Sequence, residues 1–573
     1  MIHTRGLTGA QAVLRVLGGM KVERIFASPG SEWSPVWEAL AQPPAQNEAR
    51  PLYLTSRHEE IAVSAASGYA KASGKLPAVM IHTTVGALHA SMALRAAVHE
   101  QVPMVVLSGE SVGFGEDEGP DPAPWWLGQL ADVGGPAKLV DACVKWSFGV
   151  NSKSILPATI QRACQLAMAA PRGPVFVSLP MEYLFAAMTK DAPSDSMEAP
   201  AATADAGGIQ KLADLLLEAD NPIIIAEYAG RNANIVAQTV QLAETLGAAV
   251  IETSGTGYLN FPRNHPLHGG FDPQQYLQEA DVILLLGAIS PWHPASKGPG
   301  MGVKVAVLDE NPLRTELPYW GFKTDLCLTG SVESSLEQLV RRIRKAVPAG
   351  GCLRPERAEK WRKRHEQNKR QWDEQVVGVK DRKPIDMRWV THEINQVVPA
   401  HAIIVEETIS HKLAVHRYID RLEPGSYFAG SIGGLGTGLG TSLGVKAAAP
   451  ERPVICLIGD GSFNYDPALA AMGFCQEHRM PILIVLFNNF GYLSQKSGIP
   501  RYFPDGWAVR NKNFIGISIS PSPDYAMLAR AFEGYGEKVE EPAEVRKALQ
   551  RGLEAVAAGQ FALIDIRLEP VNP

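Results

Sequence analysis

Nine short apolar runs, alternating with helical stretches, restrict the folds open to this chain more than any other feature of its sequence. They come in three groups: PAVMIHTT, VPMVVLSGE and GPVFVSLP; NPIIIAEYAG, ADVILLLGAIS and VKVAVLDENP; and HAIIVEET, RPVICLIGDG and MPILIVLFNN. Runs of this length and composition, separated by helices, are typical of parallel strands that are buried on both faces. The pattern predicts an α/β protein with three doubly wound parallel-sheet domains.

Two seams separate the three groups. At 573 residues the chain is too long for a single hydrophobic core. Residues 191–208 are rich in Pro, Ala, Ser and Asp without apolar periodicity, which is typical of a linker. A second seam starts at residues 347–351 and leads into RPERAEKWRKRHEQNKRQWDEQ, whose charge density indicates a solvated helix or connector. We therefore place the domains at residues 1–190, 208–346 and 375–573.

The charge balance argues against nucleic acid and membrane partners. The chain has 54 Lys and Arg against 60 Asp and Glu, so its net charge of -6 provides no basic surface for nucleic acid or an anionic membrane. Charged residues interrupt every apolar stretch near the start before it reaches the length of a signal peptide or a membrane span. The predicted partners are small molecules or other copies of the chain.

The cysteines favour a reducing compartment. None of them forms a CxxC pair, which fits structural thiols better than a disulfide framework or a zinc site. We therefore expect a cytoplasmic protein. The six are Cys143, Cys164, Cys327, Cys352, Cys456 and Cys475.

The segment GDGSFNYDPALAAMGFCQEHRMPILIVLFNN, residues 459–489, begins with an acidic turn after one predicted strand and ends with paired amides after the next. Doubly wound sheets bind ligands beyond the carboxyl ends of their strands, so we expect Asp460 and Asn489 to meet. Their oxygens and a loop carbonyl suit Mg²⁺, which leaves further positions for phosphate and water. The amides of Gly461 and Ser462 would face a phosphate at a helix N-terminus. The segment predicts a diphosphate bound through a metal, although each half alone is common turn chemistry.

GDG, 26 further residues and NN resemble the diphosphate and magnesium motif of thiamine diphosphate enzymes. The resemblance extends over nearly the whole chain. The domain order resembles the pyrimidine-binding, central and diphosphate-binding domains of the decarboxylases and acetolactate synthases. This resemblance implies thiamine diphosphate and Mg²⁺ as cofactors, with Asp460 and Asn489 binding the metal through their side chains and Gly491 through its carbonyl.

The first domain contains the acid that this cofactor needs. In SRHEEIAVSAASGYAKASG, residues 56–74, Glu59 precedes GYA at the spacing of the family, which selects it over Glu60. The resemblance implies that Glu59 hydrogen-bonds N1′ of the aminopyrimidine and favours the imino tautomer, whose N4′ can remove the thiazolium C2 proton. The alternative is a helix N-terminal carboxylate that interacts only with the helix dipole.

A glycine-rich segment, GSIGGLGTGLGTSLG, covers residues 430–444. Read alone, its GxGxxG pattern suggests a dinucleotide loop, but no acidic residue follows at the expected distance on a second strand. The resemblance instead implies that the Gly433 carbonyl accepts from the aminopyrimidine N4′ and that Leu435 lies beneath the two rings of a bent cofactor. It also places the Ser410 hydroxyl of VEETISHK against the diphosphate, where a helix cap is the alternative.

Within the family the sequence looks most like benzoylformate decarboxylase. FASPGSEWSP carries a PGS turn with Ser31, VMIHTTVG places His82 at a catalytic histidine, and GAISPWHP places His293 near the second after a gap of one residue. The implied reaction is non-oxidative decarboxylation of a 2-oxo acid, aromatic or bulky, to an aldehyde. Ser31 would position the carboxylate, and the two histidines would move protons. The alternatives are a helix cap for Ser31 and satisfied core positions for the histidines.

Two segments depart from that enzyme and leave the substrate open. They are the acid-, proline- and tryptophan-rich insertion at residues 113–135 and residues 491–507, which do not match the segment lining the benzoylformate pocket. Trp125, Trp126 and Trp292 either line an aromatic pocket or pack inside the protein.

Three other functions compete with simple decarboxylation. A carboligase of the acetolactate synthase type shares every cofactor residue, and residues 255–270 resemble the central-domain loop of such enzymes, so FAD is possible there although no motif indicates it. A non-catalytic thiamine diphosphate-binding subunit would have no need for Glu59. A nucleotide-dependent dehydrogenase would leave Asp460 and Asn489 unexplained.

The resemblance also implies an assembly. In this family the pyrimidine is held by the first domain of one chain and the diphosphate by the third domain of another. We therefore expect a homodimer at least, and a homotetramer with two-fold symmetry as the next step.

Overall fold

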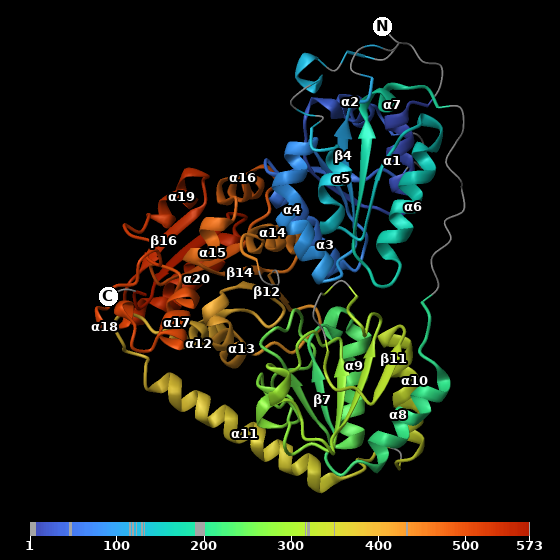
Figure 1. Ribbon diagram of the computed structural model, residues 1–573. Coiled ribbons are helices and arrows are strands. Elements are labelled where there is room, and N and C mark those ends of the chain that lie inside the picture. The colour runs from blue at the N-terminus through green and yellow to red at the C-terminus, as the bar shows by residue number, and fades with distance from the viewer. Residues whose placement is uncertain are drawn as a thin grey trace. The chain divides into compact units, whose positions relative to one another are not determined.

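The protein is described from a computed structural model (Figure 1). The description covers residues 7–44, 49–113, 116, 120, 121, 123–127, 130, 132–188, 201–315, 317, 321–348, 350–430 and 434–571, without the side chains of Trp125 and Leu127. The chain forms two compact units. Unit 1 comprises Met1–Pro200, Ser431–Glu451 and Asn464–Met480, and unit 2 comprises Ala201–Gly430, Arg452–Phe463 and Pro481–Pro573.

Unit 1 contains one six-stranded parallel sheet of order β2-β1-β3-β4-β6-β5. Its strands are β1 (Arg24–Ser28), β2 (Leu52–Thr55), β3 (Ala78–Ile81), β4 (Met104–Glu110), β5 (Trp146–Gly149) and β6 (Pro174–Pro180). Its helices are α1 (Gly9–Gly19), α2 (Ser34–Ala41), α3 (Glu59–Ser73), α4 (Thr84–His99), α5 (Pro136–Val140), α6 (Leu156–Met168), α7 (Met181–Phe185), α14 (Gly438–Ala448) and α16 (Ala468–His478).

Unit 2 contains two parallel sheets. The five-stranded sheet, of order β11-β10-β9-β7-β8, consists of β7 (Ile223–Ala226), β8 (Ala249–Glu252), β9 (Val282–Leu286), β10 (Lys304–Asp309) and β11 (Leu326–Thr329). The six-stranded sheet, of order β13-β12-β14-β15-β17-β16, consists of β12 (Ile403–Glu407), β13 (Tyr427–Ala429), β14 (Val454–Gly459), β15 (Leu483–Asn488), β16 (Tyr535–Val539) and β17 (Ala562–Arg567).

The helices of unit 2 include a long charged one, α11. They are α8 (Ala206–Glu218), α9 (Ala233–Leu246), α10 (Val332–Lys345), α11 (Pro355–Val377), α12 (Met387–Val397), α13 (Lys412–Tyr418), α17 (Leu493–Tyr502), α18 (Trp507–Arg510), α19 (Tyr525–Ala531) and α20 (Val545–Ala557). The short helix α15 (Asp460–Tyr465) begins in unit 2 directly after β14.

The predicted fold class is confirmed. All nine apolar runs contain strands, and their central residues are buried because helices cover both faces of each sheet. The charged run after residue 351 is the helix α11, as expected. The domain boundaries at 1–190, 208–346 and 375–573 stay predictions. Among the described helices, none combines the length and the apolar character that a membrane crossing needs.

A glycine contact joins α3 and α14 inside unit 1. A Cβ atom on Gly444 of α14 would lie 1.8 Å from the Ala65 carbonyl oxygen of α3, and one on Gly68 would lie 2.0 Å from the Thr441 carbonyl oxygen. The two backbones are therefore too close for any side chain at these positions. The glycine pattern at 430–444 is thus explained in part by helix packing.

Substitution of Gly444 by Ala is expected to destabilise the protein by about 1–3 kcal/mol, because the added methyl group overpacks a backbone contact. Gly19 of α1 is the matched control, since an added Cβ there meets no atom within 4 Å. A helical Gly-to-Ala change without a clash stabilises by roughly 0.5–1 kcal/mol. Thermal unfolding followed by circular dichroism should give opposite signs for the two variants, and equal midpoints would contradict the contact.

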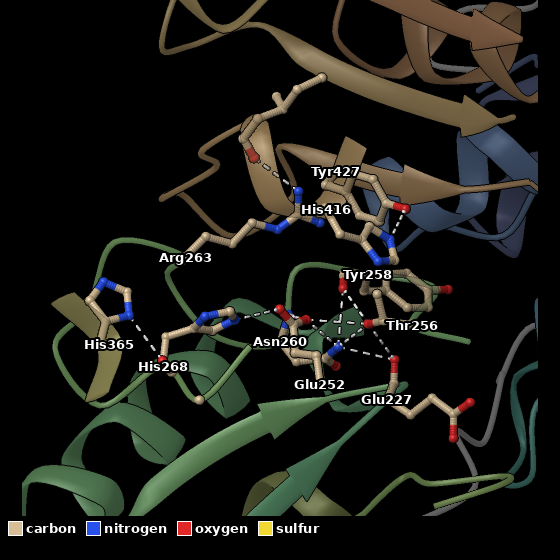
Figure 2. Close-up of polar contacts among 12 residues, drawn as sticks. Glu227, Glu252, Thr256, Tyr258, Asn260, Arg263, His268, His365, His416 and Tyr427 are labelled. Atoms are coloured by element: carbon tan, nitrogen blue, oxygen red, sulfur yellow. Dashed lines mark hydrogen bonds and ion pairs between the residues drawn. The ribbon is translucent and has the colours of Figure 1, made fainter. Parts of the chain in front are cut away.

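A buried polar network links the two sheets of unit 2 (Figure 2). Arg263, in the long loop after β8, donates from Nη1 to the Ile419 carbonyl at 3.0 Å, and its guanidinium lies 4.4 Å from the centre of the Tyr427 ring. On the other side of the network, the His268 Nε2 lies 3.1 Å from the fully buried Glu252 carboxylate. The loop after β8 is therefore fixed at two positions, Arg263 and His268, by side-chain contacts.

Candidate active site

The first part of the site lies in unit 2, beyond the carboxyl ends of three neighbouring strands. Asp460 follows β14, Asn489 follows β15, and Ser410 and His411 follow β12. Since parallel strands end at the same edge, the sheet brings these residues together as the sequence predicted for Asp460 and Asn489. Gly461 and Ser462 lie in the first turn of α15, and both are buried.

Three oxygen atoms converge at this edge. The Asn489 side-chain oxygen faces the Asp460 Oδ1 at 3.0 Å and the Gly491 carbonyl oxygen at 2.7 Å, and it meets no donor in this orientation. Turning the amide by 180° would instead let its nitrogen donate to both oxygens. One carboxylate, one amide and one carbonyl oxygen form a donor set that suits a hard cation such as Mg²⁺. The residues present therefore fit the expected metal.

The electrostatic surroundings of Asp460 also favour a cation. Burial raises the pKa of Asp460 to about 6, and the amides of Gly461, Gly491 and Asn489 only partly counter this effect. The neighbouring His411 is neutral, because burial lowers its pKa to about 4. Its Nε2 lies 3.3 Å from the Asn489 amide. A metal ion would supply the positive charge that this imidazole cannot.

A tight turn places the Gly491 carbonyl beside Asn489. Phe490, between them, adopts a left-handed backbone conformation with φ of 62°. A Cβ on Gly491 would lie 2.2 Å from the Ile517 carbonyl oxygen, so only glycine fits at this position. The Gly491 amide in turn donates to the Asp460 Oδ2 at 2.9 Å. The turn thereby ties two of the three candidate metal ligands to each other.

The second part of the site lies in unit 1, again beyond the ends of neighbouring strands. Ser31 follows β1, Glu59 follows β2 and His82 follows β3. Gly86, in the first turn of α4, lies between the last two: a Cβ there would be 3.3 Å from both the Glu59 Oε1 and the His82 Cβ. The sheet therefore brings Glu59 and His82 close to the same glycine.

A buried acid, Glu32, holds His82. Both oxygens of its fully buried carboxylate lie 2.9 Å from the His82 Nδ1, while the imidazole side chain stays 25 % exposed. Burial alone would lower the pKa of His82, but the hydrogen bond and charge of Glu32, with a contribution from Glu59, raise it above its usual value. The sequence prediction missed Glu32. The pair presents a fixed imidazole that keeps its proton to higher pH than a free histidine.

Substitution of Glu32 by Gln is expected to lower the pKa of His82, because burial then acts without the opposing charge. The imidazole would become neutral at lower pH than in the wild type. Diethyl pyrocarbonate modifies only the neutral imidazole, so the pH dependence of His82 labelling, read by mass spectrometry, should move to lower pH. Glu38 on α2 is exposed and provides the control as Glu38→Gln. An unchanged labelling profile in Glu32→Gln would contradict the coupling.

Two histidines surround Glu59. The carboxylate Oε2 lies 3.1 Å from the His89 Nδ1, and the rings of His89 and His58 stack with centres 5.1 Å apart. His58 caps α3 by accepting from the Glu60 amide. The Glu59 side chain is 12 % exposed and is the first residue of α3. It is partly open to a ligand, as the role of a pyrimidine-binding acid requires.

The remaining predicted residues differ in their surroundings. Ser31 is exposed, and its side chain caps neither of the helices that follow. His293 is exposed in unit 2 and Leu435 is half-buried in unit 1. Ser410 is half-buried, and Gly433 lies outside the described residues. Nothing in these positions tests their predicted roles.

Two of the three candidate pocket tryptophans have described side chains, and both are buried. Trp126, from the insertion, is buried with its ring edge-on to His82, at 6.4 Å between centres. Trp292 is buried in the core of the five-stranded sheet and packs against Phe322. The Trp125 side chain lies outside the described part. Of the two candidates with described side chains, Trp126 makes a ring contact with a predicted site residue, His82.

Three family models match the chain in order. They are the N-terminal TPP binding domain, the central domain and the C-terminal TPP binding domain of thiamine pyrophosphate enzymes, matched by residues 7–113, 209–339 and 408–566. Together they span more than half of the chain, and they include Ser31, Glu59, His82, Ser410, Asp460 and Asn489.

Two of the similar curated proteins represent different enzymes. Benzoylformate decarboxylase of Pseudomonas aeruginosa is 27 % identical over 96 % of this chain and 96 % of its own length. The large subunit of acetolactate synthase isozyme 3 of Escherichia coli is 25 % identical over 98 % of this chain and 95 % of its own length. A solved Rhodococcus jostii thiamine diphosphate-dependent 4-hydroxybenzoylformate decarboxylase has a TM-score of 0.80 at 24 % identity, covering 98 % and 99 % of the two chains. That structural likeness supports the fold.

Proposed function

Because this chain belongs to the thiamine pyrophosphate enzyme family, we propose that it decarboxylates a 2-oxo acid with an aromatic or bulky side chain, without oxidation, to an aldehyde. The observation that carries the proposal is the Glu32–His82 pair beside Glu59. Aldehyde release requires a proton donor near the reacting carbon, and a histidine with a raised pKa is suited to that role. The similarity to benzoylformate decarboxylase agrees with this choice.

The chain's own residues have distinct roles in this proposal. Asp460, Asn489 and the Gly491 carbonyl would hold Mg²⁺, and the amides at the start of α15 would face the diphosphate. When bound, thiamine diphosphate supplies a thiazolium ring that accepts the electrons released as CO₂ leaves.

Near the reacting carbon, Glu59 would hold a proton at the pyrimidine N1′ and Ser31 would orient the substrate carboxylate. His82, fixed through Nδ1 by Glu32, would present its other nitrogen, Nε2, to the substrate. His293 would move the second proton. Trp126, edge-on to His82, would exclude water and favour an apolar substrate side chain.

The test is a product assay with purified protein, thiamine diphosphate, Mg²⁺ and a panel of 2-oxo acids that includes benzoylformate. Aldehyde in equal amount to CO₂ is the expected result. A 2-hydroxy ketone as main product would replace the proposal by carboligation, in line with the similarity to acetolactate synthase. No CO₂ from any acid, with the cofactor bound, would reject decarboxylation and favour a binding role.

We also propose a homodimer, or a tetramer of two dimers, as the active assembly. In support, Val85 and Leu88 of α4 are 39 % and 54 % exposed on either side of Gly86, which contacts Glu59. Apolar side chains beside a site usually face a covering surface. Analytical ultracentrifugation of the active protein measures its mass, and a fully active monomer would refute the shared site.

A further inference from the structure

The five-stranded sheet of unit 2 has one position where a ligand would be expected. The chain runs from β7 to its neighbour β8 and then returns to the other side of β7 to form β9. The carboxyl ends of β7 and β9 therefore form the switch point of the sheet, which is where open α/β sheets bind ligands. A flavin or adenine nucleotide bound there needs free backbone amides for its phosphates.

The backbone amides at this position already donate hydrogen bonds to a side chain of the protein, that of Glu227. Glu227 follows β7 directly, and its backbone amide still donates to the Leu286 carbonyl of β9 at 3.3 Å. Its carboxylate Oε2 accepts from the Ile289 amide at 2.6 Å and from the Ser290 amide at 3.2 Å. The residue is only 4 % exposed. The carboxylate thus bridges the two strand ends in the place that a phosphate would take.

The loop after β8 closes over the same side chain. A Cβ on Gly255 would lie 2.3 Å from the Glu227 Oε1, so the loop backbone is packed against this oxygen. The Glu227 backbone carbonyl also accepts from Thr256 Oγ1 at 3.2 Å and from Asn260 Nδ2 at 3.1 Å (Figure 2). Glu227 is therefore held at its backbone and at both carboxylate oxygens.

A buried ion pair lies near the Glu227 carboxyl group. Arg314, in the segment after β10, is 2 % exposed and donates to the Asp309 Oδ2 at 2.8 Å. Its charge, already paired with Asp309, also acts on Glu227. The guanidinium is thus already paired, so a diphosphate entering this space would have to compete with Asp309 for it.

We propose that Glu227 closes the switch-point crevice of the central domain, and that this domain therefore holds neither flavin nor adenine nucleotide. The loop at residues 255–270 resembles the central-domain loop of enzymes that may bind flavin. In this protein the loop packs on Glu227 and on the six-stranded sheet of unit 2. The residues present therefore do not fit the FAD that the carboligase alternative allowed in this domain. The proposal is independent of the proposed decarboxylation.

The test measures bound nucleotide and not turnover. Wild-type protein with thiamine diphosphate and Mg²⁺ is expected to release no flavin when denatured and to show no binding of FAD or ADP in calorimetric titrations. Flavin at one molecule per chain, or saturable ADP binding, would overturn the proposal. Because neither readout involves a 2-oxo acid, the result is separate from the outcome of the product assay.

The variant Glu227→Ala tests whether this side chain is the occupant. It removes the carboxyl group that accepts from the amides of Ile289 and Ser290, so ADP binding absent from the wild type is expected. A folded Glu227→Ala protein that binds no ADP would overturn the role of Glu227. Glu227→Asp is the second variant if the first fails to fold, because it withdraws the carboxyl group by one methylene and keeps that group in the protein. Weak ADP binding by this variant supports the proposal, and its absence in a folded protein counts against it.

Discussion

Asp460→Asn is expected to weaken the Mg²⁺-dependent binding of thiamine diphosphate by roughly 100-fold or more. The substitution keeps the shape of the side chain and removes the one charged oxygen donor among the three that converge beside Asn489. Removal of one partner from a buried ionic contact costs about 3–5 kcal/mol, which corresponds to that loss in a binding constant. Calorimetric titration of the cofactor, with and without a chelator, measures the effect.

The control for this experiment is Asp505→Asn, because Asp505 is exposed in the same domain after α17. Its binding constant should stay at the wild-type value. If Asp460→Asn also binds thiamine diphosphate like the wild type, and circular dichroism shows an intact fold, the metal binds elsewhere. The three oxygens that converge beside Asn489 would then have only a structural role.

Glu59→Gln is expected to lower the rate of cofactor activation by about 10²–10⁴-fold, the usual range for loss of a general acid or base. Cofactor binding should change less, since the predicted diphosphate contacts lie elsewhere in the chain. The readout is exchange of the cofactor C2 proton for deuterium, followed by NMR after rapid quenching. This rate does not depend on knowing the substrate.

Glu60→Gln is the matched control. Glu60 is the next residue of the same helix, but it is 6 % exposed and accepts from the Ala93 amide at 3.3 Å. Its loss should affect stability and leave the exchange rate near the wild-type value. Slow exchange in Glu60→Gln with fast exchange in Glu59→Gln would reverse the assignment of the two acids.

The fold and the Asp460–Asn489 contact could be predicted because both follow from local pattern. Apolar runs of strand length define the sheets, and turn residues directly after neighbouring strands meet at one edge. Asp460 and Asn489 directly follow two consecutive strands. Their contact could therefore be predicted without knowing how more distant parts of the chain pack.

Glu32 could not be predicted in the same way. An acid after a PGS turn reads as solvent-exposed, and its partner His82 is 50 residues away in the chain. Its burial depends on the order of the strands, which places β1 next to β3. The role of Glu227 could not be predicted from the sequence either. It depends on the strand order, in which β8 and β9 lie on the two sides of β7. The sequence signal for Glu227 was an acidic residue directly after an apolar strand. Many exposed loops show the same pattern.

Unit 1 is assembled from distant stretches of chain, and this has a consequence during synthesis. Glu477 of α16 is 422 residues from Thr55, to which it is hydrogen-bonded, and it also pairs with Arg57. The six-stranded sheet of unit 1 is complete at Pro180, so at a ribosomal speed of about 5–20 residues per second it waits roughly 15–60 s for this partner. Until α14 has been made, the face of α3 that contains Ala65 and Gly68 lacks the close backbone contact that α14 provides in the folded protein. Nascent chains should therefore need chaperone protection, and a fragment ending after the first sheet should aggregate where the whole protein does not.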